Sequence, residues 1–480
     1  MSGSRTIIKF KKLPIASRIF TLEDQKNFAK FSGDFNPIHL NEKESIKTHA
    51  GQPIVHGIHL LMWAVNVLEV NIKMNTSMHV NFKSQVNLNT EVFAHHDQQK
   101  NIILISNKNK SKIYADVKII DHDNSNNIQP KNREVVFSLN SDNPEEPNIE
   151  DILLENKNYN LFGGSKIDLG KKIFPFLVND IGLNTVYEIA CVSSIVGMKI
   201  PGKHSLFVSL DLDFSSYENQ ENYIKVKSKH EILKIISISY HGINFQGDIK
   251  AFFRPEPSLT RSINDLKLEY KDRNLLSKKT VLVIGGSRGI GAYVSKLCAI
   301  MGGEVTFTFN ANEEDAQKIS KEVTNDGKKI EYFKLDATDL ESIYKINKSF
   351  DHIYYFATPK IISNESEDLD ISLINKYRLF YVTSFEKIIR FFSIKNKKSN
   401  FLYPSTTYIN ENKEGFKEYI ASKIEGENLC KAFNRDLNIN ILFPRLPPLD
   451  TDQNLSIIPK NHENASDYAF KIINLMMEKN

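Results

Sequence analysis

The sequence predicts a multidomain protein with two architectures in succession: an α+β part, then an α/β part built on a doubly wound parallel sheet. Residues 1–257 show the same order of elements twice, in which a long apolar helix precedes a short turn and four strand-like segments. From residue 278 onward strands and helices alternate, which is the pattern of a parallel sheet. At 480 residues, the chain is also too long for one ordinary core.

The first repeat, residues 1–140, is predicted to begin with a strand within residues 5–19. A helix over 21–31 follows, because a threonine cap and two acids occupy its first turn. Residues 58–70 are apolar nearly all round and predict a buried helix. Strands are then expected over 78–82, 90–95, 102–106 and 113–120.

The second repeat, residues 141–257, follows a polar connection that holds a short strand within 134–139. Its apolar helix is predicted over 182–196 and ends in a turn at 197–202. Four more strands are expected over 206–214, 223–230, 235–240 and 244–253.

Residues 258–277 are polar and charged, and we interpret them as a linker to a third domain, residues 278–480. That domain opens with a continuous apolar strand over 280–284. The helices expected next are 292–301 and 313–325, and the strands are 304–309 and 330–335.

Composition excludes several classes of function. Hydrophobic residues make up 41% of the chain and charged residues 25%, which is typical of a globular protein, and the net charge of +4 is too dispersed for a nucleic-acid surface. The three cysteines are far apart in apolar segments, which excludes a disulfide framework and favours a reducing, cytoplasmic compartment. We also expect no membrane span and no secretory signal.

The sequence GDFNPIH over residues 33–39 places an acid, Asp34, five residues before an imidazole, His39. Pro37 fixes its own backbone and restricts the residue before it, so a stiff bend holds the two side chains. The sequence GQPIVHG follows at 51–57 and leads into the apolar helix. A helix that begins at Gly57 exposes free N–H groups that can polarise a carbonyl.

These two motifs resemble the MaoC-type (R)-specific enoyl-thioester hydratases and dehydratases, which have the hot-dog fold, a sheet wrapped round one central helix. The resemblance implies that Asp34 and His39 hold a water and act as a general acid–base pair, with the N–H of Gly57 facing the thioester oxygen. The chain departs from the family at residues 61–63, where bulky side chains predict an altered acyl channel. The alternative is that Asp34 caps a turn and His39 is a structural loop histidine.

Three nearby histidines, His49, His56 and His59, do not share one helical face and lack a carboxylate partner, so we predict no metal site. Residues 193–205 also resemble part of a hot-dog repeat, but the second repeat has no acid–histidine pair. We therefore expect a double hot-dog with one hydration site, in which the second repeat completes the pocket wall.

The sequence GGSRGIG over residues 285–291, between a strand and a helix, resembles the glycine-rich turn of the short-chain dehydrogenases/reductases. The resemblance makes this turn, with Gly285, Ser287, Arg288, Gly289, Ile290 and Gly291, a cofactor-binding candidate. Asp336, after the third strand, resembles the adenine contact, and Ala357 lies after the fourth strand. The second strand ends at Asn310 with no acid, and Arg288 lies in the turn, which favours NADPH over NADH.

The sequence YIASK over residues 419–423 resembles the active-site Tyr-x3-Lys of the same family. Tyr419 would donate a proton to a carbonyl that receives hydride, and Lys423 would lower the phenol pKa and hold the ribose. Either Ser405 or Thr406 supplies the hydroxyl partner, and Asn375 stands roughly where the family has a helix asparagine. The usual Asn-Asn-Ala-Gly is replaced by YYFATP at 354–359, so a non-catalytic domain is an alternative.

Together the resemblances imply a bifunctional enzyme: NADPH-dependent reduction of a 3-oxoacyl thioester and dehydration of the (R)-3-hydroxyacyl product, or the reverse. The expected partner is a thioester of acyl carrier protein or coenzyme A, with no nucleic acid, and a homo-oligomer remains open. The alternatives are an acyl- or partner-binding protein with degenerate enzyme folds, and a reductase with a non-thioester, sugar-type substrate.

Overall fold

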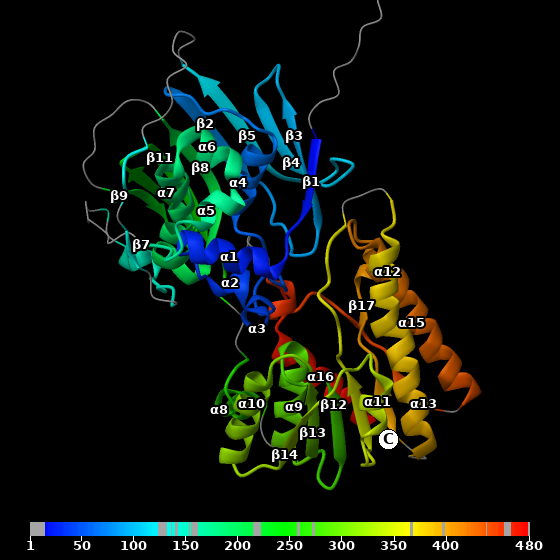
Figure 1. The fold of residues 1–480 in the computed structure, drawn as a ribbon. Helices are drawn as coiled ribbons and strands as arrows, with labels where there is room; N and C mark the ends of the chain where they lie inside the picture. Colours follow the sequence, from blue (N-terminus) through cyan, green and yellow to red (C-terminus); the bar gives the residue numbers. More distant parts are fainter. Residues whose placement is uncertain are drawn as a thin grey trace, which may run out of the picture. The chain divides into compact units, whose positions relative to one another are not determined.

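The computed structural model of the chain forms two compact units, Met1–Glu256 and Pro257–Asn480, which we describe separately (Figure 1). The residues that the structure describes are 15–122, 132–135, 137–139, 143–152, 154, 162–214, 222–256, 260–270, 274–364, 368–395, 399–437, 439–455 and 462–478.

One antiparallel sheet organises the first unit, in the strand order β1-β3-β4-β5-β2-β8-β11-β10-β9. Each half of the sheet comes from one repeat, and the seam pairs β2 with β8, for example Val80 opposite Leu210. This single antiparallel sheet is consistent with the predicted double hot-dog. Its strands are β1 Ile15–Ile19, β2 Thr76–Phe82, β3 Glu91–Asp97, β4 Ile102–Ser106, β5 Ile113–Asp121, β8 Ser205–Asp213, β9 Tyr223–His230, β10 Ile235–His241 and β11 Gln246–Phe253.

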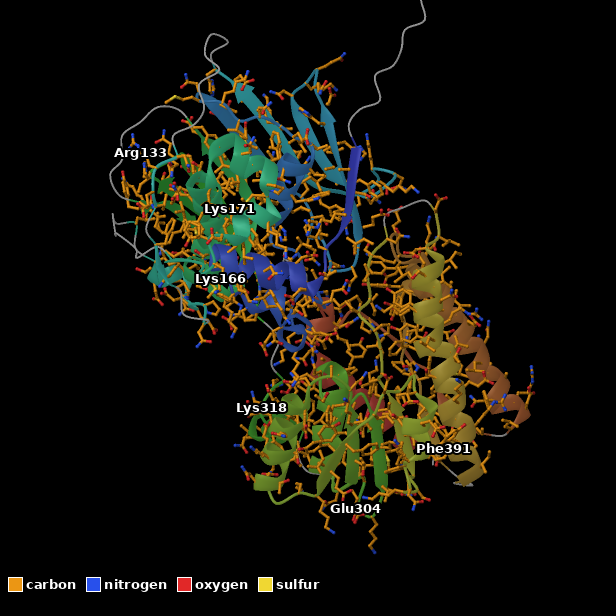
Figure 2. The ribbon with its side chains drawn as sticks, in the orientation of Figure 1. Arg133, Lys166, Lys171, Glu304, Lys318 and Phe391 are labelled. Carbon is orange, nitrogen blue, oxygen red and sulfur yellow. The ribbon has the colours of Figure 1, made fainter. Side chains whose placement is uncertain are left out.

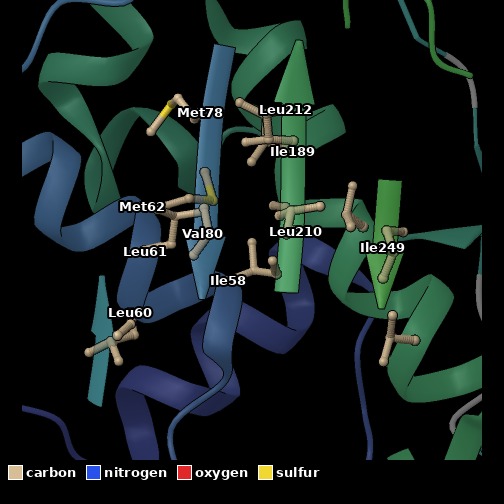
Figure 3. Close-up of a cluster of buried hydrophobic side chains, with 14 of the residues drawn as sticks. Ile58, Leu60, Leu61, Met62, Met78, Val80, Ile189, Leu210, Leu212 and Ile249 are labelled. Carbon is tan, nitrogen blue, oxygen red and sulfur yellow. The ribbon is translucent and has the colours of Figure 1, made fainter. Parts of the chain in front are cut away.

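Two buried helices, α4 and α7, pack against this sheet. Figure 3 shows Ile58, Leu61 and Met62 of α4 beside Val80 of β2 and Leu210 of β8, in the core shared by both repeats. Burial of apolar side chains on nearly every face explains why both helices form where the sequence is apolar all round. The helices of this unit are α1 Leu22–Ser32, α2 Pro37–Leu40, α3 Glu42–Ser45, α4 Gly57–Val67, α5 Leu169–Ile173, α6 Pro175–Ile181 and α7 Leu183–Ser194.

Local sequence signals set several boundaries. Thr21 and Asp24 form a reciprocal capping box at the start of α1. Helix α7 runs on into a π-helical turn, Ile195–Lys199, and a 3-10 turn, Gly202–His204. The strand expected within 134–139 is described only at β6, Ser138–Leu139, which pairs with β7, Phe162–Gly163, and residue 136 lies outside the described residues. Another 3-10 turn covers Ile149–Asp151.

The second unit has a parallel sheet in the order β14-β13-β12-β15-β16-β18. The strand order reverses between β12 and β15, and the carboxyl ends of strands at such a point form the binding crevice of doubly wound sheets. Its strands are β12 Thr280–Ile284, β13 Glu304–Phe309, β14 Ile330–Lys334, β15 His352–Tyr355, β16 Asn400–Leu402 and β18 Asn440–Leu442, with a separate pair, β17 Ser405–Thr406 and β19 Arg445–Leu446.

Helices cover this sheet on both faces in Figure 1. Figure 2 labels Glu304 at the start of β13 and Lys318 on α10, both pointing outward. The helices are α9 Gly289–Ile300, α10 Glu313–Asn325, α11 Leu340–Tyr344, α12 Ile371–Arg378, a π-helical stretch Leu379–Ser384, α13 Phe385–Lys395, α14 Tyr408–Glu411, α15 Lys417–Asp436, a 3-10 turn Asp452–Asn454 and α16 Ala465–Glu478.

The predicted linker over 258–277 was wrong in part. Residues Ile263–Tyr270 form helix α8, whose Ile263 and Leu266 are buried in the core of the second unit. The Tyr270 hydroxyl lies 2.9 Å from Ser466 Oγ of α16, which fixes the helix end. The polar composition hid this helix because only one face of its two turns is apolar.

No single helix in the described ranges has both the length and the apolar character needed to cross a bilayer. One sharply bent pair, Pro175–Ile181 with Leu183–Lys199, meets that test by length and composition.

Candidate active sites

The Asp34 loop lies between α1 and α2 in the first unit. Gly33 ends α1 with a φ of 80°, a left-handed conformation that glycine adopts without strain. Asn36 then caps α2 by accepting from the N–H of Ile38, and Pro37 occupies the first helical position. Local chemistry therefore fixes the bend that the sequence predicts, with the Asp34 side chain buried and His39 half-buried.

Asp34 and His39 lie beside each other and beside His56. One ligand-type atom from each of the three lies within 4.8 Å of the others. Nδ1 of His39 is 2.9 Å from the carbonyl oxygen of Ile54, and since a carbonyl only accepts, Nδ1 carries the proton. The lone pair of Nε2 is therefore available to accept a proton from a water molecule or a substrate.

The second repeat holds the Asp34 carboxyl group. Ser193 on α7 donates a hydrogen bond from Oγ to Oδ2 of Asp34 at 2.6 Å. The backbone N–H of Asn36 donates to Oδ1 at 3.1 Å. Gly197 packs so closely that a Cβ there would lie 2.3 Å from Oδ1. Neither Ser193 nor Gly197 was predicted to contact Asp34, although both stand in the segment that resembles a hot-dog repeat.

Asn36 provides a second connection between the repeats. Its Nδ2 donates to the carbonyl oxygens of Gly197 at 2.8 Å and Gly202 at 3.1 Å. The loop that carries Asp34 is thus anchored on the turn that follows α7. Residues of the second repeat therefore contact both the Asp34 carboxyl group and the loop that carries it.

Burial shifts both candidate groups toward their neutral forms. Desolvation raises the pKa of Asp34 to about 7, although the bonds from Ser193 and Asn36 oppose the shift. Desolvation lowers the pKa of His39 to about 4, against the favourable bond to Ile54. Between these values a protonated carboxyl group faces a neutral imidazole, which is a matched acid and base.

His56 is fully buried and braces the site. Its Nδ1 lies 2.8 Å from Gln25 Oε1 and its Nε2 lies 3.1 Å from the backbone oxygen of Asp34. Its ring stacks on that of His39 with centroids 3.8 Å apart. Because both ring nitrogens already face protein atoms, a metal ion at Asp34 and His39 would have to displace these contacts to use His56. His59 lies beside the same Gln25 oxygen, at 3.4 Å.

Helix α4 begins at Gly57, and the first intrahelical bond joins the N–H of Leu60 to the oxygen of His56. The N–H groups before Leu60 therefore have no partner within the helix. A side chain at position 57 would approach the ring of Phe82 to 3.1 Å, so glycine leaves this helix end open to close approach.

The second unit's glycine-rich turn fits a nicotinamide dinucleotide. Gly285 has a φ of 78°, and a Cβ there would lie 2.9 Å from the backbone nitrogen of Ala357. A Cβ at Gly291 would lie 2.2 Å from the oxygen of Gly285, while Gly289, with a φ of 54°, opens helix α9. Tight turns at a helix N-terminus are what a pyrophosphate requires, so these residues could hold the cofactor.

Arg288 of the turn forms an ion pair with Asp452, and its Nε lies 3.9 Å from Oδ2 of Asp315 on α10. Asn310 is exposed just after β13, while Asp336 accepts from the N–H of Thr338 at 2.9 Å. Ser287 and Ile290 complete the turn, where Ile290 packs against the core. The turn, Asn310, Asp336 and Ala357 follow the carboxyl ends of β12, β13, β14 and β15, which form the edge at which doubly wound sheets bind their ligands.

The Thr406 side chain lies near the Tyr419 phenol and accepts a hydrogen bond from the backbone N–H of Tyr408 at 3.3 Å. Burial raises the pKa of the Tyr419 phenol above its usual value, and the Thr406 side chain opposes the rise. Ser405 instead donates to Oε1 of Glu427 at 2.5 Å, and Arg445 pairs with the same carboxylate. Of the two hydroxyl candidates, Thr406 is the one that contacts Tyr419.

Lys423 is buried among the rings of Tyr381, Tyr403 and Tyr419, of which only Tyr419 was predicted from the sequence. Its Nζ donates to the oxygen of Pro404 at 2.6 Å and lies 3.8 Å from the ring centroid of Tyr381. Nζ lies 5.7 Å from the ring centroid of Tyr419. Burial lowers the pKa of Lys423 to about 7. The side chain of Asn375 is exposed on α12.

The first unit thus places an acid beside an imidazole, and the second places a glycine-rich turn between a buried strand and a helix, with Tyr419 and Lys423 on helix α15. Residues 7–117 match the family model of the MaoC like domain, and residues 279–354 match that of the short chain dehydrogenases. The chain carries a MaoC-like domain in its N-terminal part and a short chain dehydrogenase domain in its C-terminal part. The second family uses a nicotinamide nucleotide.

One curated relative is named as an oxidoreductase. A Schizosaccharomyces pombe protein named as an uncharacterized oxidoreductase is 36% identical over 90 residues, which span 18% of this chain and 26% of that protein. The chain therefore matches about a quarter of that relative's length.

Solved structures include a Serratia marcescens short-chain dehydrogenase/reductase, 21% identical, covering 42% of this chain and 91% of that one, with a TM-score of 0.38. A Sinorhizobium meliloti dehydrogenase/reductase is 23% identical, with 42% and 88% coverage and a TM-score of 0.38. A putative Escherichia coli short chain dehydrogenase complexed with NADPH is 18% identical, with 42% and 92% coverage and a TM-score of 0.39.

Proposed function

We propose that the chain is a bifunctional enzyme of acyl-thioester metabolism, which reduces a 3-oxoacyl thioester with NADPH and interconverts the (R)-3-hydroxyacyl and 2-enoyl thioesters. The observation that carries the proposal is the pairing of a buried carboxyl group and a neutral imidazole, Asp34 and His39, beside the N-terminus of α4. The 3-hydroxyacyl group links the two reactions, because it is the product of one and the substrate of the other.

In the hydration direction, Nε2 of His39 takes a proton from a water held beside Asp34. The water oxygen bonds to C3 of the enoyl group, and negative charge develops on the thioester oxygen. The N–H of Gly57 donates a hydrogen bond to that oxygen. The protonated carboxyl group of Asp34 then delivers a proton to C2, and proton exchange with solvent restores the pair. Dehydration follows the same steps in reverse.

In the second unit, the nicotinamide nucleotide would supply the hydride when bound. The residues that would hold it are Gly285, Gly289 and Gly291 of the turn. Tyr419 stays protonated at neutral pH because burial raises its pKa, so its hydroxyl can donate a proton to the carbonyl oxygen. Thr406 orients that hydroxyl, and Lys423 is the ribose contact.

The preference for NADPH rests on charge at the end of β13. Asn310 presents no carboxylate there, and the Arg288 guanidinium lies near the start of α10. The negative charge of a 2′-phosphate attracts this cation, and position 310 has no carboxylate that would repel the phosphate. The phosphate would compete with Asp315 and Asp452 for the guanidinium. We also propose that the carrier is acyl carrier protein or coenzyme A and that the protein works in the cytoplasm.

A direct test measures both activities on the purified full chain. NADPH oxidation with an acetoacetyl thioester and the loss of enoyl absorbance with a crotonyl thioester should both be catalysed. Absence of both activities in the folded protein would refute the proposal and favour a binding function.

The exposed Asn375 and the substituted segment 354–359 favour a second candidate for the C-terminal unit, a reductase of a non-thioester carbonyl. Crotonyl hydration without acetoacetyl reduction, together with NADPH oxidation by a ketosugar, would support that candidate.

A further inference from the structure

Arg254 follows strand β11 at the end of the sheet and is only 5% exposed. Its Nη2 donates to the carbonyl oxygen of Lys203 at 2.6 Å. Within the described part of the chain, Nε and Nη1 are buried and have no hydrogen-bond partner. A guanidinium has five N–H donors, so most of the donor capacity of this buried cation is unused.

This guanidinium adjoins the hydration site. Nδ2 of Asn36 also donates to the oxygen of Lys203, at 3.3 Å, so Arg254 and the Asp34 loop share one acceptor. The positive charge of Arg254 contributes to the lowered pKa of His39. The cation is therefore close enough to act on the group that would take a proton from water.

In the described part of the chain, the groups around Arg254 do not pair with its Nε and Nη1. Nδ1 of His204 is another buried nitrogen without a partner among the described residues. The carboxylates of Glu44 and Glu146 help keep Arg254 charged, but within the described ranges no ion pair to Arg254 forms. Leaving buried donors unpaired costs free energy, so a ligand that supplies acceptors would be held strongly.

We propose that Arg254 binds a carboxylate on the acyl chain of the substrate, so that the hydration site acts on the thioester of a dicarboxylic acid. The inference rests on the proposed hydratase function and names its substrate class. A carboxylate can take both free nitrogens of a guanidinium in a bidentate pair.

A phosphate on the thioester carrier has the same chemistry but a different position. It lies a full pantetheine arm away from the reacting carbons. Arg254 and Asn36 instead donate to the same carbonyl oxygen, and Asn36 belongs to the loop that carries the acid and the imidazole. Proximity to the reacting carbons therefore favours an anion on the acyl chain.

The test compares N-acetylcysteamine thioesters, which carry no phosphate, on the full-length protein. The substrates are the crotonyl thioester, the 4-carboxybut-2-enoyl thioester and its neutral methyl ester. Crotonyl-pantetheine 4′-phosphate is the additional substrate that would reveal a phosphate site. The variants are Arg254→Met and Arg254→Lys, with Lys227→Met, an exposed cation paired with Asp248, as the matched control.

We expect kcat/KM for the acid to exceed that for its methyl ester by at least about tenfold. Arg254→Met should abolish this ratio, Arg254→Lys should keep part of it, and Lys227→Met should leave it unchanged. The ratio is informative even if a variant weakens the whole site, because both substrates would then lose activity together. Calorimetric binding of the saturated glutaryl thioester, which cannot be hydrated, should show the same dependence on Arg254.

Equal activity on the acid and the ester would overturn the inference, yet hydration of the crotonyl thioester would leave the proposed function standing. An Arg254-dependent preference for the phosphate-bearing crotonyl thioester alone would also overturn it, in favour of a carrier contact. If no enoyl thioester is hydrated by the folded protein, the proposed hydratase function itself fails.

Discussion

Replacing Ser193 with alanine removes a hydroxyl of the second repeat. That hydroxyl donates a hydrogen bond from its Oγ to Oδ2 of Asp34 at 2.6 Å. This bond favours the carboxylate and so opposes the burial that raises the pKa of Asp34 to about 7. Without it, the pKa of Asp34 should rise further. Because the account uses protonated Asp34 as the acid, hydration should decline at a higher pH in the variant than in the wild type.

The size of the shift follows from the bond that is lost. A hydrogen bond to a charged group contributes roughly 1.5–3 kcal/mol. One pKa unit corresponds to about 1.4 kcal/mol. We take the lower end, since water can replace part of the contact, and expect the alkaline limb to move upward by about one unit.

The assay is kcat/KM for crotonyl-thioester hydration as a function of pH. Wild-type activity should fall as the pH rises through about 7, where Asp34 loses its proton, and should fall again as the pH drops toward about 4, where His39 gains one. These limbs belong to the coupled pair. Ser194→Ala is the matched control, because the Ser194 hydroxyl donates to Cys191 within its own helix.

An alkaline limb that stays in place in Ser193→Ala would refute the reasoning, provided that the variant keeps its fold. It would mean that Asp34 is not the acid of the reaction or that the second repeat does not act on it. An equal shift in Ser194→Ala would also contradict the account, because that hydroxyl donates to the backbone oxygen of Cys191 in its own helix.

Gly197→Ala should lower hydration at least about tenfold and leave reduction intact, since its Cβ would collide with the fixed Asp34 carboxyl group; unchanged hydration kinetics would contradict this packing. Glu188→Ala should lower the free energy of unfolding, measured by urea denaturation, by about 3 kcal/mol, because Tyr240 and the turn that follows it lose a buried acceptor. A decrease in that free energy near zero would show that water replaces the carboxylate. Arg288→Ala should reduce the ratio of kcat/KM for NADPH to that for NADH, and an unchanged ratio would remove the basis for the NADPH preference.

Local sequence determined much of what could be predicted. The Asp-x-Asn-Pro-x-His spacing fixes the bend at Asp34 by capping and proline geometry within a few residues. The glycine-rich turn likewise depends on neighbours along the chain, since Gly285 and Gly291 are close in sequence. Periodicity located the buried helices and the alternation of strands in the second unit.

Contacts between distant segments could not be predicted in this way. Ser193 and Asp34 are 159 positions apart, so only the pairing of β2 with β8 and the packing of α7 bring them together. The burial of the Arg254 guanidinium could not be predicted, because nothing beside it in sequence indicates that the side chain is buried. The choice of Thr406 over Ser405 depends on which hydroxyl faces Tyr419. The Ser405 hydroxyl donates to Glu427 instead.

The central claim is that one chain carries two separate active sites, and two variants in two assays test it most directly. Asp34→Asn should abolish hydration of a crotonyl thioester and leave NADPH-dependent reduction of an acetoacetyl thioester unchanged. Tyr419→Phe should abolish that reduction and leave hydration unchanged. Loss of both activities in either folded variant would contradict the claim.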